Sequence, residues 1–313
     1  MWGFVGKRIV ATIPVMIVVT LAVFLLLRLS PGDPAAIIAG DYATADQVAK
    51  IRAQLGLDQP IHVQFVHWML QLLRGDLGVS IFSNLPVTTL IAQRIEPTLM
   101  LALTTIIFSV VVAVPLGVLA AWKAGTFVDR AVMVFAVVGF SVPVFVLGYF
   151  LIYGLALGLR WFPVQGYRSP FDSLPLFFAH ITLPTLTLSA VYVALVARIT
   201  RASVLEVLEE DYIRTARAKG QIERKVLLVH ALRNAAVPII TVIGLGVAFL
   251  IGGVVVTESV YNIPGLGRLV VDAVLKRDYP IIQGLILFFA FVYIVLNLVI
   301  DVAYAVINPR IRY

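Results

Sequence analysis

Residues 97–122 read PTLMLALTTIIFSVVVAVPLGVLAAW, and these 26 positions hold no acidic or basic side chain. A helix needs about 20 predominantly apolar residues to cross the hydrocarbon core of a bilayer. Inside lipid, each backbone N–H and C=O group must find its partner within the protein, and a helix achieves this within a single segment. The stretch therefore predicts a transmembrane helix.

Five further stretches have the same apolar character, at about 9–27, 131–157, 181–197, 237–256 and 281–306. The whole chain is 61% hydrophobic and 13% charged, with a mean hydropathy of +1.00. A soluble domain is about 45–50% apolar and about 25% charged. We therefore expect an all-α membrane protein with about six transmembrane helices. The first stretch lacks the small residues of a signal-peptide cleavage site, so we expect it to be retained as a span.

The connections between these stretches suggest how the chain is divided. Residues 30–96 contain no stretch of spanning length, and we expect short helices at 44–55 and 63–73. Phe65 and Trp68 in the second of these are suited to a membrane interface. We expect three parts: a tail with the first transmembrane helix (1–29), a subdomain outside the membrane (30–96) and a core transmembrane domain (97–313). The core includes a polar loop at 198–236.

Lysine and arginine placement predicts the orientation, because cytoplasmic loops of membrane proteins are enriched in these residues. The loop at 198–236 carries eight of them, whereas the basic residues of 30–96 are diluted by acidic ones. We therefore expect both termini and this loop in the cytoplasm, and 30–96 on the opposite side. The net charge of +7 fits this topology. The sequence has no basic stripe interleaved with aromatic residues, so we expect no nucleic-acid partner.

Ionisable side chains are scarce within the expected spans. His180 and Asp301 stand there, each close to an end. We interpret His180 as a hydrogen-bonded interfacial histidine, and Asp301 as a capping or pairing residue or, alternatively, a subunit contact. Proton-coupled carriers and pumps use ionisable relays deep in the membrane, and the sequence offers none.

Catalytic and cofactor motifs are missing from the sequence. It has no cysteine, and its four histidines do not follow a zinc-binding spacing. It also lacks the Gly-x-Ser-x-Gly turn of hydrolases and the Gly-x4-Gly-Lys-Ser/Thr loop that binds nucleotide phosphates. We therefore expect no enzymatic activity, metal or cofactor in this chain, and any nucleotide on another protein.

The loop at 198–236 has the pattern of two short helices joined by a glycine. Ser203 is a candidate N-cap, and apolar residues recur at helical spacing after it, at Leu205, Leu208, Tyr212 and Ala216. Gly220 is expected to end this helix, because glycine adopts the positive φ of a helix C-terminus. A second helix follows at about 222–232. Small side chains next to arginine and lysine suit docking into a groove of another protein.

This loop resembles the cytoplasmic loop of bacterial ABC importer permeases, whose general pattern is Glu-Ala-Ala-x3-Gly-x9-Ile-x-Leu-Pro. Ala216, Gly220 and Leu232 match the pattern, whereas Arg214 and Thr215 replace its first two residues. The sequence RTARAKG (214–220), followed by HALRN (230–234), resembles the dipeptide, oligopeptide, nickel and glutathione branch of this permease family. Further segments agree along the whole chain: PGDP (31–34), LGLDQP (55–60), GDLG (75–78), NIPGLGR (262–268), RDYP (277–280) and NPRIRY (308–313). Within such systems the chain is similar to the permease with the long outward loop after its first span.

The resemblance implies a type I permease in the bacterial inner membrane, with 30–96 as a periplasmic subdomain. The chain would form half of the translocation pathway beside a second homologous permease, a paralogue. A periplasmic binding protein would deliver the solute, and two ATP-binding subunits would hold ATP and Mg. Residues expected to couple this chain to the ATP-binding subunits are Tyr212, Arg214, Thr215, Ala216, Arg217, Ala218, Lys219, Gly220 and Leu232, with Tyr212 and Leu232 packing the loop onto the membrane domain.

Two other classes of function were weighed against this one. A self-sufficient secondary transporter would show inverted repeats, with midplane ionisable groups or broken helices, and no convincing repeat is found. A membrane enzyme or assembly factor lacks a visible catalytic constellation. The cargo stays open at this point: dipeptides, longer peptides, glutathione, nickel chelates and opine-like compounds all fit the resemblance.

Overall fold

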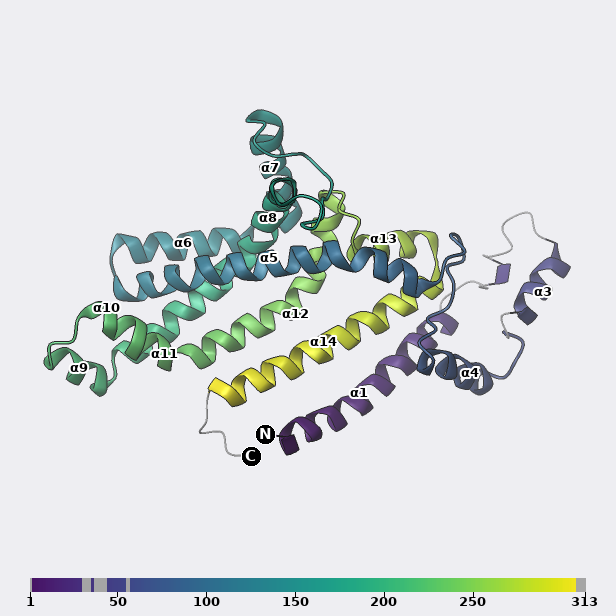
Figure 1. Cartoon of the computed structure of the whole chain (residues 1–313), viewed down its shortest axis with the longest axis horizontal. Coiled ribbons are helices and arrows are strands. Elements are labelled where there is room, and N and C mark those ends of the chain that lie inside the picture. Colours follow the sequence, from purple (N-terminus) through teal and green to yellow (C-terminus); the bar gives the residue numbers. More distant parts are fainter. Residues whose placement is uncertain (1, 30–34, 37–43, 55–56, 308–313) are drawn as a thin grey trace. The chain divides into compact units, whose positions relative to one another are not determined.

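The computed structural model describes residues 2–29, 35–36, 44–54 and 57–307 (Figure 1). This part of the chain consists of helices joined by turns and loops, and its only β-structure is an isolated bridge between Val79 and Pro86. The expected all-α class is confirmed. The motif segments 31–34 and 308–313, and the first two residues of 55–60, lie outside the described residues. The elements are α1 (Trp2–Leu29), α3 (Ala45–Gln54), α4 (Ile61–Leu73), α5 (Val87–Trp122), α6 (Phe127–Ser141), α7 (Val144–Leu151), η1 (Ile152–Gly158), α8 (Leu174–Leu208), α9 (Asp211–Ala218), α10 (Glu223–Lys225), η2 (Val226–Ala231), α11 (Leu232–Asn234), α12 (Ala236–Val260), α13 (Leu266–Lys276) and α14 (Tyr279–Ile307), where η marks π-helical turns.

Three of these helices are long and apolar enough to cross a membrane: α5, α8 and residues 279–302 of α14. Two bent pairs raise the number to five if each pair is one span, namely α6 with α7–η1 and 223–234 with the start of α12. The first expected span lies in α1, whose apolar part is Val10–Leu25. By length and composition, the described residues thus contain three to five candidate spans, against the six expected.

The third expected stretch, 131–157, forms two helices that meet at 103°. The break falls at Val142 and Pro143, where the backbone of Val142 is extended (φ −84, ψ 124). Proline has no N–H to donate and disfavours helical geometry in the residue before it, so α6 ends here.

The chain forms two compact units, one of residues 1–5, 94–269 and 293–313, the other of 6–93 and 270–292. The expected division at 29/30 and 96/97 stays a prediction. In the first unit, α8 is the most buried of the long helices. The hydroxyl of Tyr192 on α8 donates to the carbonyl of Ile243 on α12 at 2.5 Å, and Gly246 leaves room for the tyrosine ring.

The second unit contains the two short helices expected between 44 and 73. Thr44 and Gln47 exchange hydrogen bonds at the start of α3, which is the reciprocal arrangement of a capping box. Phe65 and Trp68 of α4 pack on Phe24 of α1, with ring centroids 5.1 and 5.5 Å apart. These two aromatic side chains therefore hold α4 against the first apolar helix.

Candidate functional site

The polar loop begins later than the sequence suggested, because α8 continues unbroken to Leu208. Ser203 is buried inside α8, so the expected N-cap at this position is wrong. The chain turns at Glu209 and Glu210, and Glu210, in extended conformation, precedes α9. The expected apolar row from 205 to 216 therefore belongs to two helices. The two helices are separated at Glu209 and Glu210. The spacing of the apolar residues alone did not show this break.

Helix α9 ends in a Schellman motif at Gly220, whose φ is +75°. The N–H of Gln221 donates to the carbonyl of Ala216 at 3.2 Å, and the N–H of Gly220 donates to the carbonyl of Arg217 at 2.9 Å. These are the two hydrogen bonds that define the motif, and the positive φ is the reason for a glycine here. The expected glycine turn is confirmed.

One side of α9 is anchored and the rest is exposed. Ile213 is fully buried, whereas Tyr212 is 43% exposed. The anchor is thus one residue beyond the tyrosine that the sequence suggested. Burial, together with the charge of Glu210, raises the pKa of the Tyr212 hydroxyl. The expected coupling residues Arg214, Thr215, Arg217, Ala218, Lys219 and Gly220 are exposed, and Ala216 is half-buried.

An ion pair connects the two arms of the loop across the glycine turn. The guanidinium of Arg217 donates to both carboxylate oxygens of Glu223, at 2.7 and 3.3 Å. Both side chains are more than a third exposed, so the pair contributes at most about 1 kcal/mol to stability. Arg214 makes a longer contact with Asp211 within α9, at 3.3 Å. Arg217 therefore has an intramolecular partner as well as an exposed position.

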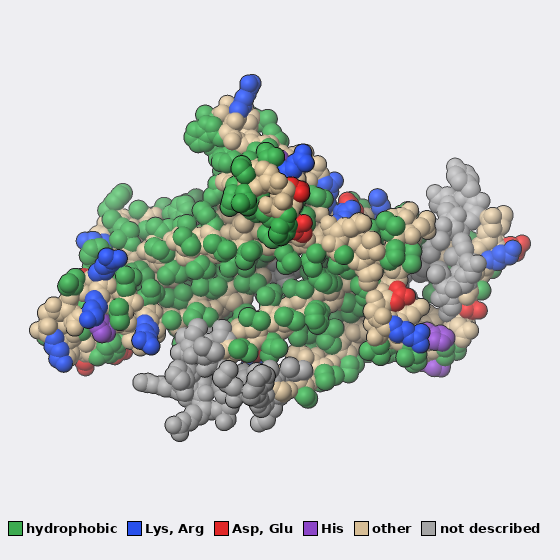
Figure 2. All heavy atoms as spheres, in the orientation of Figure 1, with side chains coloured by type: hydrophobic (Ala, Val, Ile, Leu, Met, Phe, Trp, Pro, Cys, Tyr) green, Lys and Arg blue, Asp and Glu red, His purple; other side chains and the backbone are tan. Residues whose placement is uncertain are grey.

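The second arm, from α10 through η2 to α11, attaches the loop to the transmembrane helices. Its apolar side chains Leu227 and Ala231 are buried in a cluster with Val118 of α5 and Val204 of α8, and Leu232 packs against the same cluster. Leu232 thus lies where the sequence placed it. The loop therefore contacts α5, α8 and the start of α12 in one apolar cluster. Figure 2 shows that lysine and arginine side chains gather over α9 and the turns that follow it.

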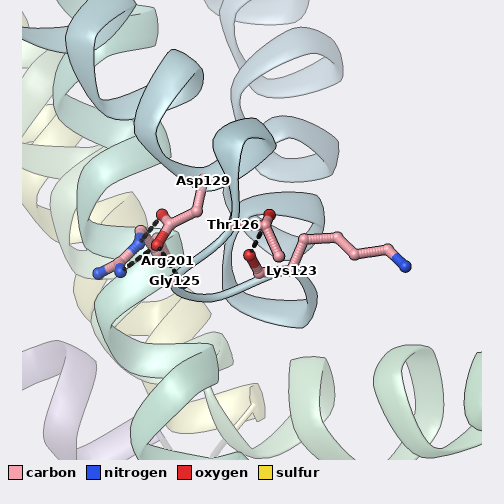
Figure 3. Close-up of polar contacts among 5 residues, drawn as sticks. All are labelled: Lys123, Gly125, Thr126, Asp129 and Arg201. Carbon is pink, nitrogen blue, oxygen red and sulfur yellow. Dashed lines mark hydrogen bonds and ion pairs between the residues drawn. The ribbon is translucent and has the colours of Figure 1, made fainter.

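A second ion pair, which the sequence analysis missed, ties α8 to the turn between α5 and α6 (Figure 3). Asp129, 4% exposed, receives hydrogen bonds from two nitrogens of Arg201 at 2.5 and 2.7 Å. The N–H of Gly125 donates to the same carboxylate at 2.9 Å. An aspartate in the first turn of an apolar helix was the available signal. The loop-bearing end of α8 is held by directional bonds as well as by apolar contacts.

A buried carboxylate near the other end of α5 was also missed. Glu258, in the last turn of α12, is fully buried. It accepts hydrogen bonds from the hydroxyl of Thr98 on α5 at 2.5 Å and from the N–H of Arg268 in α13 at 3.0 Å. A side chain on Gly265 would overlap this carboxylate. The glycines of the motif NIPGLGR therefore leave space for the carboxylate that caps α13. In the sequence, Glu258 shortly before this motif was the signal that could have predicted the contact.

His180 agrees with its interpretation as a hydrogen-bonded residue. Its Nδ1 lies 2.8 Å from the carbonyl of Leu176, one turn earlier in α8. Asp301 is half-buried in α14. Among the described residues, no group of three or more histidine, aspartate or glutamate side chains is arranged to hold a metal ion.

The comparisons with known proteins match this architecture. Residues 113–313 match the family described as the binding-protein-dependent transport system inner membrane component, and residues 1–102 match the N-terminal family of the same systems. The chain belongs to this family. It is 56% identical over 310 residues to a probable peptide ABC transporter permease protein of Sinorhizobium fredii, covering 99% of both chains. It is 47% identical over 313 residues to the glutathione transport system permease protein GsiC of Salmonella typhimurium, covering 100% of both.

The fold of this ABC importer permease is also found in solved structures. A chain of the inward-facing MetNI methionine ABC transporter superposes with a TM-score of 0.59 at 15% identity, covering 71% of this chain and 97% of that one. The protein is therefore an inner-membrane permease subunit of an ABC importer, and ATP hydrolysis takes place on separate ATPase subunits. The alternative of a self-sufficient secondary transporter gains no support from these relatives.

Proposed function

We propose that this permease imports peptides or peptide-like solutes, and that α9 is the helix by which the ATP-binding subunits drive it. Relatives at 56% and 47% identity along the whole chain carry names that specify peptide and glutathione transport. Both cargoes share amide bonds and free carboxylates. The solute would come from a periplasmic binding protein, and a second homologous permease would complete the pathway.

The observation that carries the coupling role is that α9 is exposed on one side and fixed on the other. Ile213 anchors it, while the exposed residues from Arg214 to Gly220 present small and cationic side chains to a partner. A helix of this kind fits a groove on another protein. The ATP-binding subunits, which hold ATP and Mg, would contact this surface in the cytoplasm, with both chain termini on the same side and 30–96 in the periplasm.

The geometry also supports a mechanism for the coupling. Helix α9 follows directly after α8, and the second arm of the loop packs on α5 and α8. When the ATP-binding subunits close, movement of α9 would displace these helices together as a rigid body. The pathway would thereby change between inward-open and outward-open states.

Charge reversal at Arg217 tests the docking surface. Because the Arg217–Glu223 pair is exposed, R217E is expected to leave the membrane domain folded. It should lower the amount of ATPase subunit that co-purifies and the uptake per ATP hydrolysed. K123E, at an exposed lysine outside the loop, is the matched control and should retain both.

The double variant R217E/E223R separates the two possible roles of Arg217. It restores an ion pair between the two arms but not the positive charge on α9. Continued loss of coupling supports contact with the ATP-binding subunit. Full recovery would show that Arg217 serves only the loop's own structure, and normal coupling in R217E itself would remove the docking surface from this face.

A further inference from the structure

Helices α6 and α8 enclose an apolar groove along part of their contact. The two helices run antiparallel, because Gly139 lies against Ala190 whereas Asp129 pairs with Arg201. The groove is a cavity of about 120 Å³, lined by Ala136, Val137, Phe140 and Ser141 of α6 and by Ala194, Leu195 and Arg198 of α8. Val137 and Phe140 are 62% and 59% exposed. The α6–α8 groove therefore opens to the outer surface of the described chain.

The length of the groove corresponds to the acyl-chain region of one leaflet. The ion pair of Asp129 and Arg201, beside the turn between α5 and α6, marks a polar level. Ser141, at the far end of the groove, is 12 positions beyond Asp129 in α6, which is about 18 Å at about 1.5 Å per residue. One leaflet contributes about 15 Å of the hydrocarbon core. An acyl chain that begins near the ion pair therefore has the length to follow the groove to the middle of the membrane.

The charged side chain among the lining residues is that of Arg198. It is exposed and makes no ion pair within the described part of the chain. The carboxylate on the facing helix, Asp129, is already bound by Arg201 and by the N–H of Gly125. Arg198 lies one turn deeper along α8 than Arg201, where a charge without a partner is costly. The groove thus combines an apolar lining with an uncompensated positive charge at its polar end.

An anionic phospholipid matches this combination. A guanidinium binds phosphate oxygens through two parallel N–H donors, and basic pockets between transmembrane helices bind anionic head groups. A second protein chain on this surface would need an acidic side chain at the depth of Arg198, which is itself costly in a membrane. A lipid brings its phosphate to this level without such a cost.

We propose that the α6–α8 groove binds an anionic phospholipid, with the phosphate on Arg198 and an acyl chain along Val137 and Phe140. The site lies one turn from the Asp129–Arg201 pair, so the lipid contacts both helices that this pair joins. The proposal requires only that α6 and α8 lie in the membrane. It does not depend on the identity of the cargo or on docking through α9.

Photoreactive lipids test the charge at the groove. Phosphatidylglycerol and phosphatidylcholine, each with a diazirine in one acyl chain, are compared in bilayers that contain the assembled importer, and mass spectrometry locates the crosslinked residues. Phosphatidylglycerol should label 136–141 and 194–198 more strongly than phosphatidylcholine does. R198Q should lower the phosphatidylglycerol labelling about fivefold, the contribution of one arginine near an anionic surface. K123Q is the control and should leave it unchanged, because Lys123 is exposed in the α5–α6 turn, points away from Arg201 (Figure 3) and does not line the groove.

Two tryptophan substitutions test the apolar part of the groove. V137W fills the groove and should lower the labelling by both lipids. V134W is the matched control, since Val134 lies one turn earlier on α6, is 61% exposed and does not line the groove. This variant should retain the labelling by both lipids.

Three outcomes would overturn the proposal. Equal labelling by the two lipids, unchanged in R198Q, would show only the nonspecific lipid layer around a membrane protein. Crosslinking of 136–141 to the second permease in place of lipid would identify a subunit interface. Loss of phosphatidylglycerol labelling on addition of inorganic phosphate would assign Arg198 to a soluble anion. A cargo other than peptide would leave the labelling unchanged, so failure here is distinct from failure of the proposed function.

Discussion

The ion pair between Asp129 and Arg201 allows the attachment of α8 to be tested quantitatively. R201A leaves the Asp129 carboxylate, whose side chain is 6% exposed, with the Gly125 N–H as its other donor among the described residues. D129A leaves the guanidinium, which is 25% exposed and retains some water. Removing one partner of a buried pair costs about 3–5 kcal/mol, whereas an exposed pair is worth about 0–1 kcal/mol. We expect R201A to cost about 3–5 kcal/mol and D129A about 1–3 kcal/mol.

The double variant D129A/R201A should be more stable than the sum of the single changes predicts. The double variant leaves neither an unpaired carboxylate nor an unpaired guanidinium, so we expect a coupling energy of at least about 1.5 kcal/mol. Unfolding of the purified complex by a denaturing detergent in mixed micelles measures all three variants on one scale. K123A serves as control, because Lys123 is in the same turn but contacts the ring of Trp122 rather than the ion pair; its cost should stay within about 1 kcal/mol.

Two results would refute this reasoning. Additive losses in D129A and R201A would show that the groups do not depend on each other. A larger loss of stability in D129A than in R201A would show that the unpaired carboxylate is not more costly than the unpaired guanidinium. Uptake per ATP hydrolysed should fall in parallel with stability, because the same contact joins the loop-bearing end of α8 to the α5–α6 turn.

Substitutions at Gly220, Glu258 and Gly246, with Gly252 as a control position, test the loop and the close contacts. A Cβ at Gly220 would meet nothing within 4 Å. G220A should therefore lower the stability only by the strain of the positive φ, about 1–2 kcal/mol, and G220N by less. Both variants should reduce the uptake per ATP hydrolysed while the complex stays assembled. At Glu258, E258Q keeps one acceptor oxygen and replaces the other by an amide donor, so either the hydroxyl of Thr98 or the N–H of Arg268 loses its acceptor. Thermal unfolding should report a loss of about 1–3 kcal/mol. G246A should cost at least about 1–3 kcal/mol because its methyl group would overlap the ring of Tyr192, whereas G252A, with open space around it, should be neutral or slightly stabilising.

Hydropathy predicted the helical class, because a long apolar segment in a membrane satisfies its backbone hydrogen bonds by forming a helix. The helix ends were less predictable. At the start of α5, Glu96 and Arg94 argue for a boundary near Pro97, yet the helix begins at Val87. Charged side chains outside the apolar core do not stop a helix; they only mark where lipid ends. The same reason explains why α8 runs on to Leu208 through a basic segment.

The glycine turn after α9 was predictable because its determinants are local. A glycine at a helix end has a conformational cause, and the Schellman hydrogen bonds span six residues. The partners of the polar side chains were not predictable, because Asp129 meets Arg201 across 72 positions and Glu258 meets Thr98 across 160. A single sequence shows that these residues are polar, but not that each is buried against a specific partner.

The two buried carboxylates hold α5 at two places along its length. Helix α5 carries Thr98, which donates to Glu258, and at its C-terminus it leads into the turn where the N–H of Gly125 donates to Asp129. Thr98 and Trp122 are 24 positions apart, which is about 36 Å along a helix at about 1.5 Å per residue. Between the two polar contacts, α5 and α8 meet through small side chains such as Gly117 and Thr200. A side chain on Gly117 would overlap Thr200, so the two helices are in close contact here. We therefore predict that a displacement of α9 tilts α5 as a whole, because α5 is held at both of these places.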